Sequence, residues 1–342
     1  MKKLKWLFFC SMLAALSYSC SSDFDITGEY KDITIVYGML ESGQDTHYIK
    51  ITKGFLGEGD ANVYAQVADS STYPDILDVK VEVYENLRLI NTVPFERTII
   101  HDKEEGVFYG GDQVVYRGVS SFEEDNDENT IYNYKLIIKN NESGKIISSE
   151  TTLVGDFEIT RPWLTLNLNQ VHFEGVDNST TLKWTLAPNA RKYEAVMDFY
   201  YTEKKFNQEE QVKEFRWGGI ANRDIEYVLN ETAQAQVKHE AFYNVVKNRV
   251  PYADASEEDQ VEYRIADSAV FRISVAGVEL STFLDVNDLS GGLTEDTPDY
   301  SNVDNGIGVF SSRKTIQNRY FISGLTTEEL KLLGLKFKSI ID

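Results

Sequence analysis

Segments in which apolar and polar residues alternate one by one dominate the sequence. Residues 33–37 are Ile-Thr-Ile-Val-Tyr, residues 79–84 are Val-Lys-Val-Glu-Val-Tyr, and similar runs cover residues 48–51 and 132–138. A period of two, rich in Val, Ile, Tyr and Thr, is typical of strands that bury one face. We therefore predict a mainly β protein with antiparallel sheets.

One pair of these runs is separated by a turn sequence. Residues 140–144 are Asn-Asn-Glu-Ser-Gly, a composition that favours a tight reversal of the chain. Alternation resumes over residues 145–151. The sequence thus predicts a β-hairpin that joins residues 132–138 to residues 145–151.

The chain is long enough for two domains, because domains usually contain about 100–200 residues and this sequence has 342. Gly155-Asp156 and the following Arg161-Pro162 interrupt the pattern and mark the expected boundary. We predict one β-sandwich domain over residues 28–156 and a second over residues 157–342.

The second domain contains a stretch with a recognisable pattern. Over residues 180–197, a strand with Leu182 and Trp184 two positions apart is followed by Pro-Asn-Ala and by a strand that opens with Tyr193. This stretch resembles the second and third strands of a fibronectin type III domain, in which the tryptophan fills the space between two sheets. The predicted fold class is therefore two immunoglobulin/fibronectin III-like β-sandwiches.

Helices are expected at two places in the second domain. A small helical insertion is predicted at about residues 229–260. Five apolar residues fall on one face of a helix drawn over residues 231–249: Val237, Ala241, Phe242, Val245 and Val246. Pro251 would stop this helix. A short C-terminal helix is predicted at residues 326–333, with Gly334 closing it.

Residues 1–19 have the layout of a secretory signal peptide. The basic start Met-Lys-Lys-Leu-Lys precedes an apolar run over residues 6–16. A membrane-spanning helix needs about 20 apolar residues, so this run is too short to remain as an anchor. The sequence Leu-Ser-Tyr-Ser before Cys20 resembles a bacterial lipobox, in the serine-rich form common in the Bacteroidota.

The lipobox resemblance implies that Cys20 becomes the first residue of the mature chain and carries diacylglycerol and an N-acyl chain such as palmitate. Three acyl chains would anchor the protein stably, since stable anchoring takes at least two. Residues 20–27 would form an acidic tether, and Ser21 implies transfer to the outer membrane, on the periplasmic or the cell-surface face. An ordinary secreted protein with a free Cys20 is the alternative.

Charge and cysteine content exclude several functions. Removal of the three signal-peptide lysines changes the formal net charge from −21 to −24. Such an acidic body repels phosphate backbones, so nucleic-acid binding is not expected. Cys10 leaves with the signal and Cys20 would carry lipid, so the mature body has no thiol for a disulfide, a zinc site or a nucleophile.

Three motifs occur in one order along the chain. They are Ile-Val-Tyr-Gly at residues 35–38, Tyr-Lys-Leu at 134–136, and Asn-Gly-Ile-Gly-Val-Phe-Ser-Ser at 305–312. Together they resemble the Bacteroidota lipoproteins of domain of unknown function 4249. That family has no assigned activity, so the resemblance implies a mainly β outer-membrane lipoprotein and transfers no functional residue. It also implies a partner, a TonB-dependent outer-membrane receptor. Gly306 and Gly308 are expected to permit close approach beside a final strand.

No catalytic set can be assembled from motifs. His47, His101, His172 and His239 are far apart in the sequence, and we expect His47 and His101 at the surface. No serine lies in a Gly-x-Ser-x-Gly elbow. With 55 acidic residues, a glycosidase-like carboxylate pair cannot be assigned from sequence. We therefore predict that the protein is not an enzyme.

Two groups of residues are candidate binding sites. Asp125, Asp127 and Asn129 place oxygen ligands at alternate positions, but the glycine and glutamate of an EF-hand loop are missing. We predict no cofactor and leave bound calcium open. Aromatic residues near the insertion would contact a glycan or a protein if exposed, and would be sandwich core if buried. They are Tyr200, Tyr201, Trp217 and Tyr227.

The function that these observations favour is a non-enzymatic binding or accessory module for an outer-membrane transporter or another envelope partner. A surface glycan-binding lipoprotein is the alternative, and a hydrolase is the third hypothesis. The fold does not choose among them, because β-sandwiches serve many unrelated functions.

Overall fold

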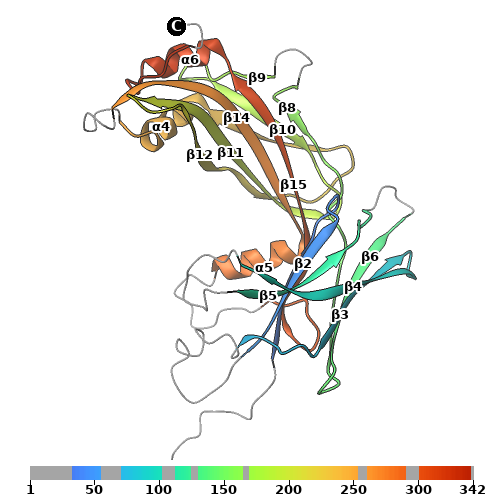
Figure 1. The fold of residues 1–342 in the computed structure, drawn as a ribbon. Helices are drawn as coiled ribbons and strands as arrows, with labels where there is room; N and C mark the ends of the chain where they lie inside the picture. Colours follow the sequence, from blue (N-terminus) through green and yellow to red (C-terminus); the bar gives the residue numbers. More distant parts are fainter. Residues whose placement is uncertain are drawn as a thin grey trace, which may run out of the picture.

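The protein folds into two lobes joined by long strands (Figure 1). Within the described residues the chain is mainly β, which confirms the predicted fold class at that level. No helix in this part of the chain is long and apolar enough to cross a membrane. The computed structural model describes residues 33–54, 71–101, 112–124, 130–164, 169–252, 260–289 and 300–339.

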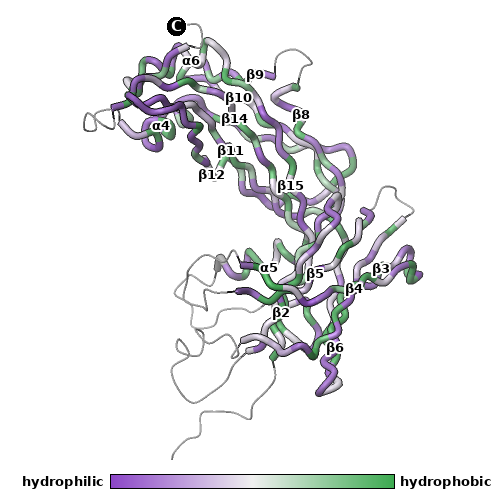
Figure 2. Tube along the Cα trace, viewed as in Figure 1, coloured by the Kyte–Doolittle hydropathy of each residue, from purple (hydrophilic) through white to green (hydrophobic). Residues whose placement is uncertain are grey.

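The N-terminal lobe is built from consecutive strands. Hydrophilic and hydrophobic positions alternate along them, as Figure 2 shows, and the buried residues alternate in the same way. All four predicted strands of this region are present, and β6 and β7 form the predicted hairpin. The bounds are β1 (Thr34–Leu40), β2 (Thr46–Lys53), β3 (Leu77–Glu85), β4 (Arg88–Ile100), β5 (Gln113–Val119), β6 (Tyr132–Asn140) and β7 (Ile146–Thr151).

The later elements form the C-terminal lobe, except that α5 lies against the N-terminal lobe (Figure 1). The strands are β8 (Ile159–Arg161), β9 (Gln170–Val171), β10 (Ser179–Thr185), β11 (Ala190–Lys205), β12 (Gln211–Asp224), β13 (Thr232–Lys238), β14 (Val261–Gly277) and β15 (Ile307–Ile322). The helices are α4 (His239–Arg249), α5 (Val278–Leu289) and α6 (Gly324–Lys331).

The C-terminal lobe is a sandwich of two sheets. Strands β13, β10 and β8 form a small sheet, and β12, β11, β14 and β15 belong to a large one. Leu182 and Trp184 share the inner face of β10 and are fully buried, as predicted. The ring of Trp184 lies 6.3 Å from that of Tyr193 on β11. Because β10 and β11 are in different sheets, Trp184 fills the space between them.

Strand β15 belongs to both lobes. Residues 313–321 pair antiparallel with β14, and residues 307–312 pair in parallel with β1. The large sheet therefore continues in the order β12-β11-β14-β15-β1-β2-β5-β4-β3-β6-β7. Thus the two predicted ranges, 28–156 and 157–342, share one sheet, and the β1–β15 pair departs from the expected antiparallel pairing.

Two glycines make this parallel pair feasible, as the sequence predicts. A Cβ atom on Gly308 would lie 2.0 Å from the carbonyl oxygen of Val36, and Gly308 has a φ of +114°. A Cβ atom on Gly306 would lie 2.8 Å from the carbonyl oxygen of Thr34. The two backbones are thus closer than any side chain would permit.

The helix predicted over residues 231–249 is wrong in its first half. Residues 232–238 form strand β13, which pairs antiparallel with β10, and α4 begins only at His239. Ala235 and Val237 alternate into the core, so pairing with β10 outweighs the helix propensity of Ala and Gln. Residues 253–259 of the predicted insertion lie outside the described residues. The C-terminal helix is present as α6, capped by Ser323.

A polar network fixes the lobes where β15 passes between them. The Lys314 amine binds Glu124 Oε2 at 2.8 Å and also binds Asp156. Ser42, in the turn between β1 and β2, donates to the same Glu124 oxygen at 2.7 Å. Burial disfavours the charge on Lys314, but its hydrogen bonds to Asp156 and Glu124 outweigh burial and raise the pKa of the amine.

We expect Lys314→Met to lower the free energy of unfolding by about 3 kcal/mol, because it leaves Glu124 buried without its cation. The lysine contribution is present below its ordinary pKa of 10.5 and is lost as the pH rises through the raised value. Urea unfolding of the wild type and of Lys314→Met should thus show a difference in the free energy of unfolding that shrinks once the pH exceeds the raised pKa of Lys314. Equal stability at pH 7 would contradict this role, and adding Glu124→Gln should restore part of the loss.

Candidate functional site

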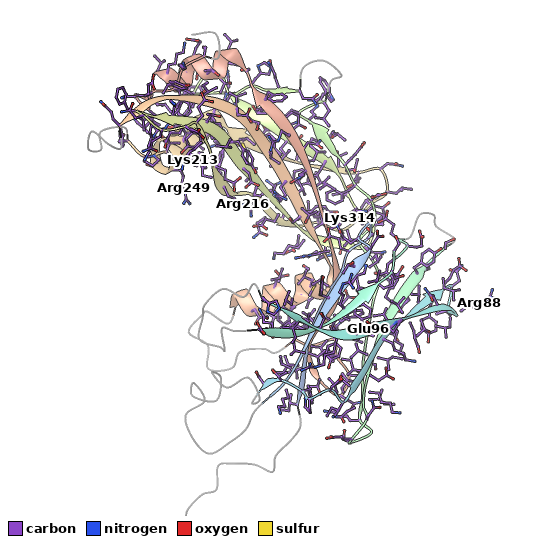
Figure 3. All side chains as sticks on the ribbon, viewed as in Figure 1. Arg88, Glu96, Lys213, Arg216, Arg249 and Lys314 are labelled. Carbon is purple, nitrogen blue, oxygen red and sulfur yellow. The ribbon has the colours of Figure 1, made fainter. Side chains whose placement is uncertain are left out.

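The outer side of the large sheet carries arginines in the C-terminal lobe. Every second residue of β11, β12, β14 and β15 points away from the sandwich core. In Figure 3, Arg216 lies on the margin of this lobe that faces the N-terminal lobe. Five residues brought together by strand register form what we call the arginine face: Asp198, Tyr200, Arg216, Arg272 and Arg319.

Asp198 is the centre of the arginine face, and its side chain is only 6% exposed. Arg216, opposite it on β12, donates from Nε and Nη2 to the two carboxylate oxygens at 2.6 and 3.0 Å. Arg272 donates from Nη2 to Oδ2 at 3.1 Å. The hydrogen bond from Arg216, helped by that from Arg272, lowers the pKa of Asp198. The carboxylate thus remains ionised and holds both guanidinium groups in place.

Tyr200 and Arg319 form the second part of the arginine face. The guanidinium of Arg319 lies over the Tyr200 ring, 4.9 Å from its centroid. Tyr200 also bonds to Glu214 across the β11–β12 pair, and this hydrogen bond raises the pKa of the phenol. The side chains of Arg216 and Arg319 are 59% and 54% exposed. Two accessible guanidinium groups and an aromatic ring are therefore held in fixed positions.

The chemistry that this arrangement supports is recognition of acidic groups. Two guanidinium groups bind the Asp198 carboxylate and a third lies over Tyr200, on a protein with a formal net charge of −21. Glu214 and Asp267 border the face, so that with Asp198 three carboxylates balance the three guanidinium groups in formal charge. Within the described residues, the buried Nε of Arg272 has no hydrogen-bond partner. Arginine and tyrosine dominate protein-binding hot spots, and the planar guanidinium matches a carboxylate.

The structure separates the four aromatic residues that the sequence suggested as contacts. Tyr200 belongs to the arginine face, whereas Tyr201 points into the core and is 5% exposed. Trp217 packs against the same core, and Tyr227 lies in a connecting segment after β12. Adjacent strand residues face opposite sides, which separates Tyr200 from Tyr201, and Tyr227 is 36% exposed but is not part of the arginine face. The arginines carry no sequence signal beyond their alternate positions in strands.

The predicted lipidation and calcium residues cannot be placed in the same way. Cys20, Asp125, Asp127 and Asn129 lie outside the described residues, so lipidation and calcium binding stay predictions. In the part of the chain that the structure describes, no three His, Cys, Asp or Glu side chains are grouped to hold a metal ion.

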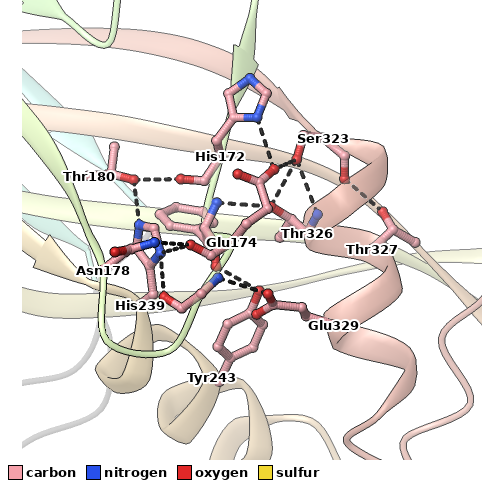
Figure 4. A network of polar contacts seen from close by, with 12 residues as sticks. His172, Glu174, Asn178, Thr180, His239, Tyr243, Ser323, Thr326, Thr327 and Glu329 are labelled. Atoms are coloured by element: carbon pink, nitrogen blue, oxygen red, sulfur yellow. Dashed lines mark hydrogen bonds and ion pairs between the residues drawn. The ribbon is translucent and has the colours of Figure 1, made fainter.

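A second polar cluster lies at the end of the C-terminal lobe near α6 (Figure 4). Glu174 accepts hydrogen bonds from Ser323 Oγ at 2.6 Å and from His172 Nδ1 at 2.9 Å. Burial disfavours the Glu174 carboxylate, but these two bonds outweigh it and lower the pKa. His239 Nδ1 donates to the backbone carbonyl of Glu174 at 2.8 Å, and its Nε2 lies 2.9 Å from Thr180 Oγ1. Folding thus brings two histidines that are 67 positions apart in the sequence to the same residue, Glu174.

This cluster does not activate Ser323 for nucleophilic attack. Ser323 is buried, with 2% of the residue exposed, and its hydroxyl donates a hydrogen bond to Glu174. The same hydroxyl accepts a hydrogen bond from the backbone N–H of Thr326 at 3.1 Å and so caps α6. A nucleophilic serine must reach its substrate, whereas the Ser323 hydroxyl is buried and its hydrogen bonds hold Glu174 and cap α6. An open groove of about 680 Å³, lined in part by His172 and Leu325, runs beside the cluster.

Comparison with known proteins does not indicate a function. No protein-family model matches the chain, and no curated protein matches it. The resemblance to domain of unknown function 4249 therefore stays a prediction.

Proposed function

We propose that the protein is a lipid-anchored accessory module of the outer membrane that binds an envelope protein and catalyses no reaction. The arginine face is the observation that carries this proposal. It joins two exposed guanidinium groups and a tyrosine ring on a rigid sheet. Groups held in place before binding lose less conformational entropy on association, which favours affinity.

The partner that suits this face is a protein with an acidic surface. Arg319 can bind a carboxylate through two parallel hydrogen bonds, and Arg216, whose Nε and Nη2 already bind Asp198, can offer its remaining N–H groups. Strands of 14 to 17 residues give the sheet an extended outer side, which suits a protein surface better than a small molecule. The family resemblance favours a TonB-dependent outer-membrane receptor as this partner.

The lipid anchor and the arginine face would act together. Acylation of Cys20 would keep the module in the same membrane as the receptor, and confinement raises the effective concentration of one partner for the other. A modest contact at the arginine face would then suffice for a stable assembly.

The two other hypotheses gain less from the described residues. Glycan binding by the four predicted aromatics loses support, because Tyr201 is buried in the core and Trp217 packs against that core. A hydrolase gains nothing from Ser323, whose hydroxyl is used in capping α6.

The proposal is tested by crosslinked capture of the tagged chain from detergent-solubilised outer membranes. We expect the wild type to enrich a barrel-type receptor and the Cys20→Ala variant to lose the membrane fraction. The double variant Arg216→Ala, Arg319→Ala should lose at least about tenfold of the captured receptor, since buried arginines at hot spots each contribute at least about 2 kcal/mol. Arg272 remains to neutralise Asp198, so the fold should persist.

The matched control removes two arginines of the N-terminal lobe, Arg88 and Arg97, both exposed on β4. This variant has the same net charge as the test variant and should capture the receptor normally. Equal loss in both variants would show that only total charge matters. Capture of no receptor by the wild type would defeat the accessory role.

A further inference from the structure

The junction between the lobes contains a groove that is lined by tyrosines and by polar residues. It lies over the outer side of β1 and β2, next to the point where β15 enters the N-terminal lobe, and has a volume of about 520 Å³. Small-ligand sites usually measure about 300–1,000 Å³ and often lie between domains. We call it the junction groove, and its lining includes Tyr37, Glu41, Gln44, Thr46, Tyr48 and Arg313.

Two tyrosines supply the aromatic surface of the junction groove. The β1–β2 register places Tyr37 opposite Lys50. Tyr48 precedes Lys50 by two residues on β2, so the side chains of Tyr37 and Tyr48 lie on the same side of the sheet. The two tyrosines are 44% and 46% exposed. Phe283 of α5 packs edge-on against Tyr37, with 6.1 Å between ring centroids. Tyr37 is thus held in place by α5, whose residues do not line the groove.

The charges in the junction groove cancel. Arg313 Nε lies 3.5 Å from Glu41 Oε2, and the arginine side chain is 60% exposed. His47, expected at the surface, is instead 3% exposed. Burial lowers the pKa of His47, so the imidazole adds no positive charge at physiological pH. The lining therefore favours a ligand without net charge.

The turn that carries several of these groups is held rigidly. Ser42 lies between Glu41 and the rest of the turn, and its hydroxyl donates to Glu124 at 2.7 Å. Glu124 in turn binds Lys314, the residue after Arg313 on β15. The polar network at the junction thus fixes both sides of the groove before any ligand arrives, which reduces the entropy lost on binding.

We propose that the junction groove binds a neutral saccharide. Aromatic faces carry partial negative charge that attracts the polarised C–H bonds of a sugar ring, and Tyr48 offers such a ring beside polar groups. Glu41 accepts hydrogen bonds, Arg313 donates them, and Gln44 and Thr46 do both. Sugar hydroxyls also donate and accept, so they match this set.

Other ligand classes fit the junction groove less well. An anionic ligand would meet the carboxylate of Glu41, and an aliphatic ligand would leave the polar groups of the lining without partners, at a cost in free energy. The saccharide site is independent of the proposed protein contact, because the arginine face uses Arg319 and the groove uses Arg313, six positions earlier on the same side of β15.

The test is affinity electrophoresis of the full chain, purified in detergent, through native gels that contain one soluble polysaccharide each. The neutral probes are xyloglucan, galactomannan, amylopectin and dextran, and the acidic probes are polygalacturonate and alginate. We expect at least one neutral probe to retard the wild type. Tyr48→Ala should weaken that retardation at least about tenfold, since a stacked aromatic is a typical hot spot.

Matched variants make the result specific to the groove. Tyr48→Phe keeps the ring and should bind, and Tyr252→Ala removes a tyrosine that is 63% exposed in the other lobe and should also bind. The Arg216→Ala, Arg319→Ala variant should bind the probe normally even where receptor capture is lost. The proposal is overturned if no neutral probe retards the wild type, if only acidic probes do, or if Tyr48→Ala is retarded like the wild type.

Discussion

Replacing Gly308 with alanine is expected to lower the free energy of unfolding by about 3–5 kcal/mol. The new Cβ atom would lie 2.0 Å from the carbonyl oxygen of Val36, which is backbone and cannot rotate away. Gly308 also has a φ of +114°, which an L-residue with a side chain rarely adopts. Relief would require β1 and β15 to separate, and this pair joins the two lobes.

Two other glycines distinguish the steric clash at Gly308 from the strain of its positive φ. Gly144 has a φ of +72° with nothing within 4 Å of the added Cβ atom, so Gly144→Ala should cost about 1 kcal/mol from backbone strain alone. Gly218 also has open space around the added atom, so Gly218→Ala should change stability little. Urea unfolding measures all three. A Gly308→Ala loss no larger than that of Gly144→Ala would mean that β1 and β15 tolerate separation.

Arg264→Met is expected to cost about 3–5 kcal/mol, because it leaves a buried carboxylate without its cation. Arg264 is fully buried and binds Glu203 Oε2 through Nε and Nη2 at 2.9 and 2.7 Å. Its Nη1 also donates to the carbonyl of Leu335 at 2.8 Å, and its backbone pairs with Lys336 and Lys338. The loss should therefore weaken the attachment of residues 335–338 as well as the sandwich.

Urea unfolding measures the loss, and hydrogen exchange at residues 335–338 locates it. The double variant Arg264→Met, Glu203→Leu is the informative control, since replacing both members of a buried pair with apolar residues is often neutral. It should recover most of the lost stability, while exchange at residues 335–338 stays fast because the bond to Leu335 is still missing. If the double variant is as unstable as Arg264→Met, the unpaired charge of Glu203 is not the cause.

The alternation of apolar and polar residues predicts the strands whose two faces differ most in burial. β1, β3 and β6 each bury every second residue, so their sequences carry the period of two. The sequence does not predict β4, because most of its residues are exposed and only Val93 and Phe95 are buried. A strand with little burial has little hydrophobic pattern for the sequence to display.

The error at residues 231–249 has a related cause. Five apolar residues satisfied a helical spacing across a segment whose first part is rich in Ala and Gln, which favour helices. The small alanines at 233 and 235 gave a weak period of two, and only the seven-residue pairing with β10 decides the conformation. A partner more than forty positions away in the chain is invisible to a local pattern.

The candidate sites depend on pairings that span still longer distances. The arginine face collects residues from four strands, and their register, rather than any motif, brings the guanidinium groups to Asp198. The junction groove needs Arg313 beside Glu41, which follows from the parallel pairing of β15 with β1. The motif at residues 305–312 indicated close approach but not which strand would be approached.

The parallel pairing of β1 and β15 also determines how the molecule carries a mechanical load. A pull on the chain before Thr34, resisted by a partner that holds the C-terminal lobe, draws β1 one way and β15 the other along their common axis. The register from Ile35–Ile307 to Leu40–Ser312 would then be sheared, so its hydrogen bonds are loaded together instead of opening one after another. Tension applied before Thr34 is thus transmitted to the C-terminal lobe along β15, and the strong direction of the protein runs from the start of β1 to that lobe.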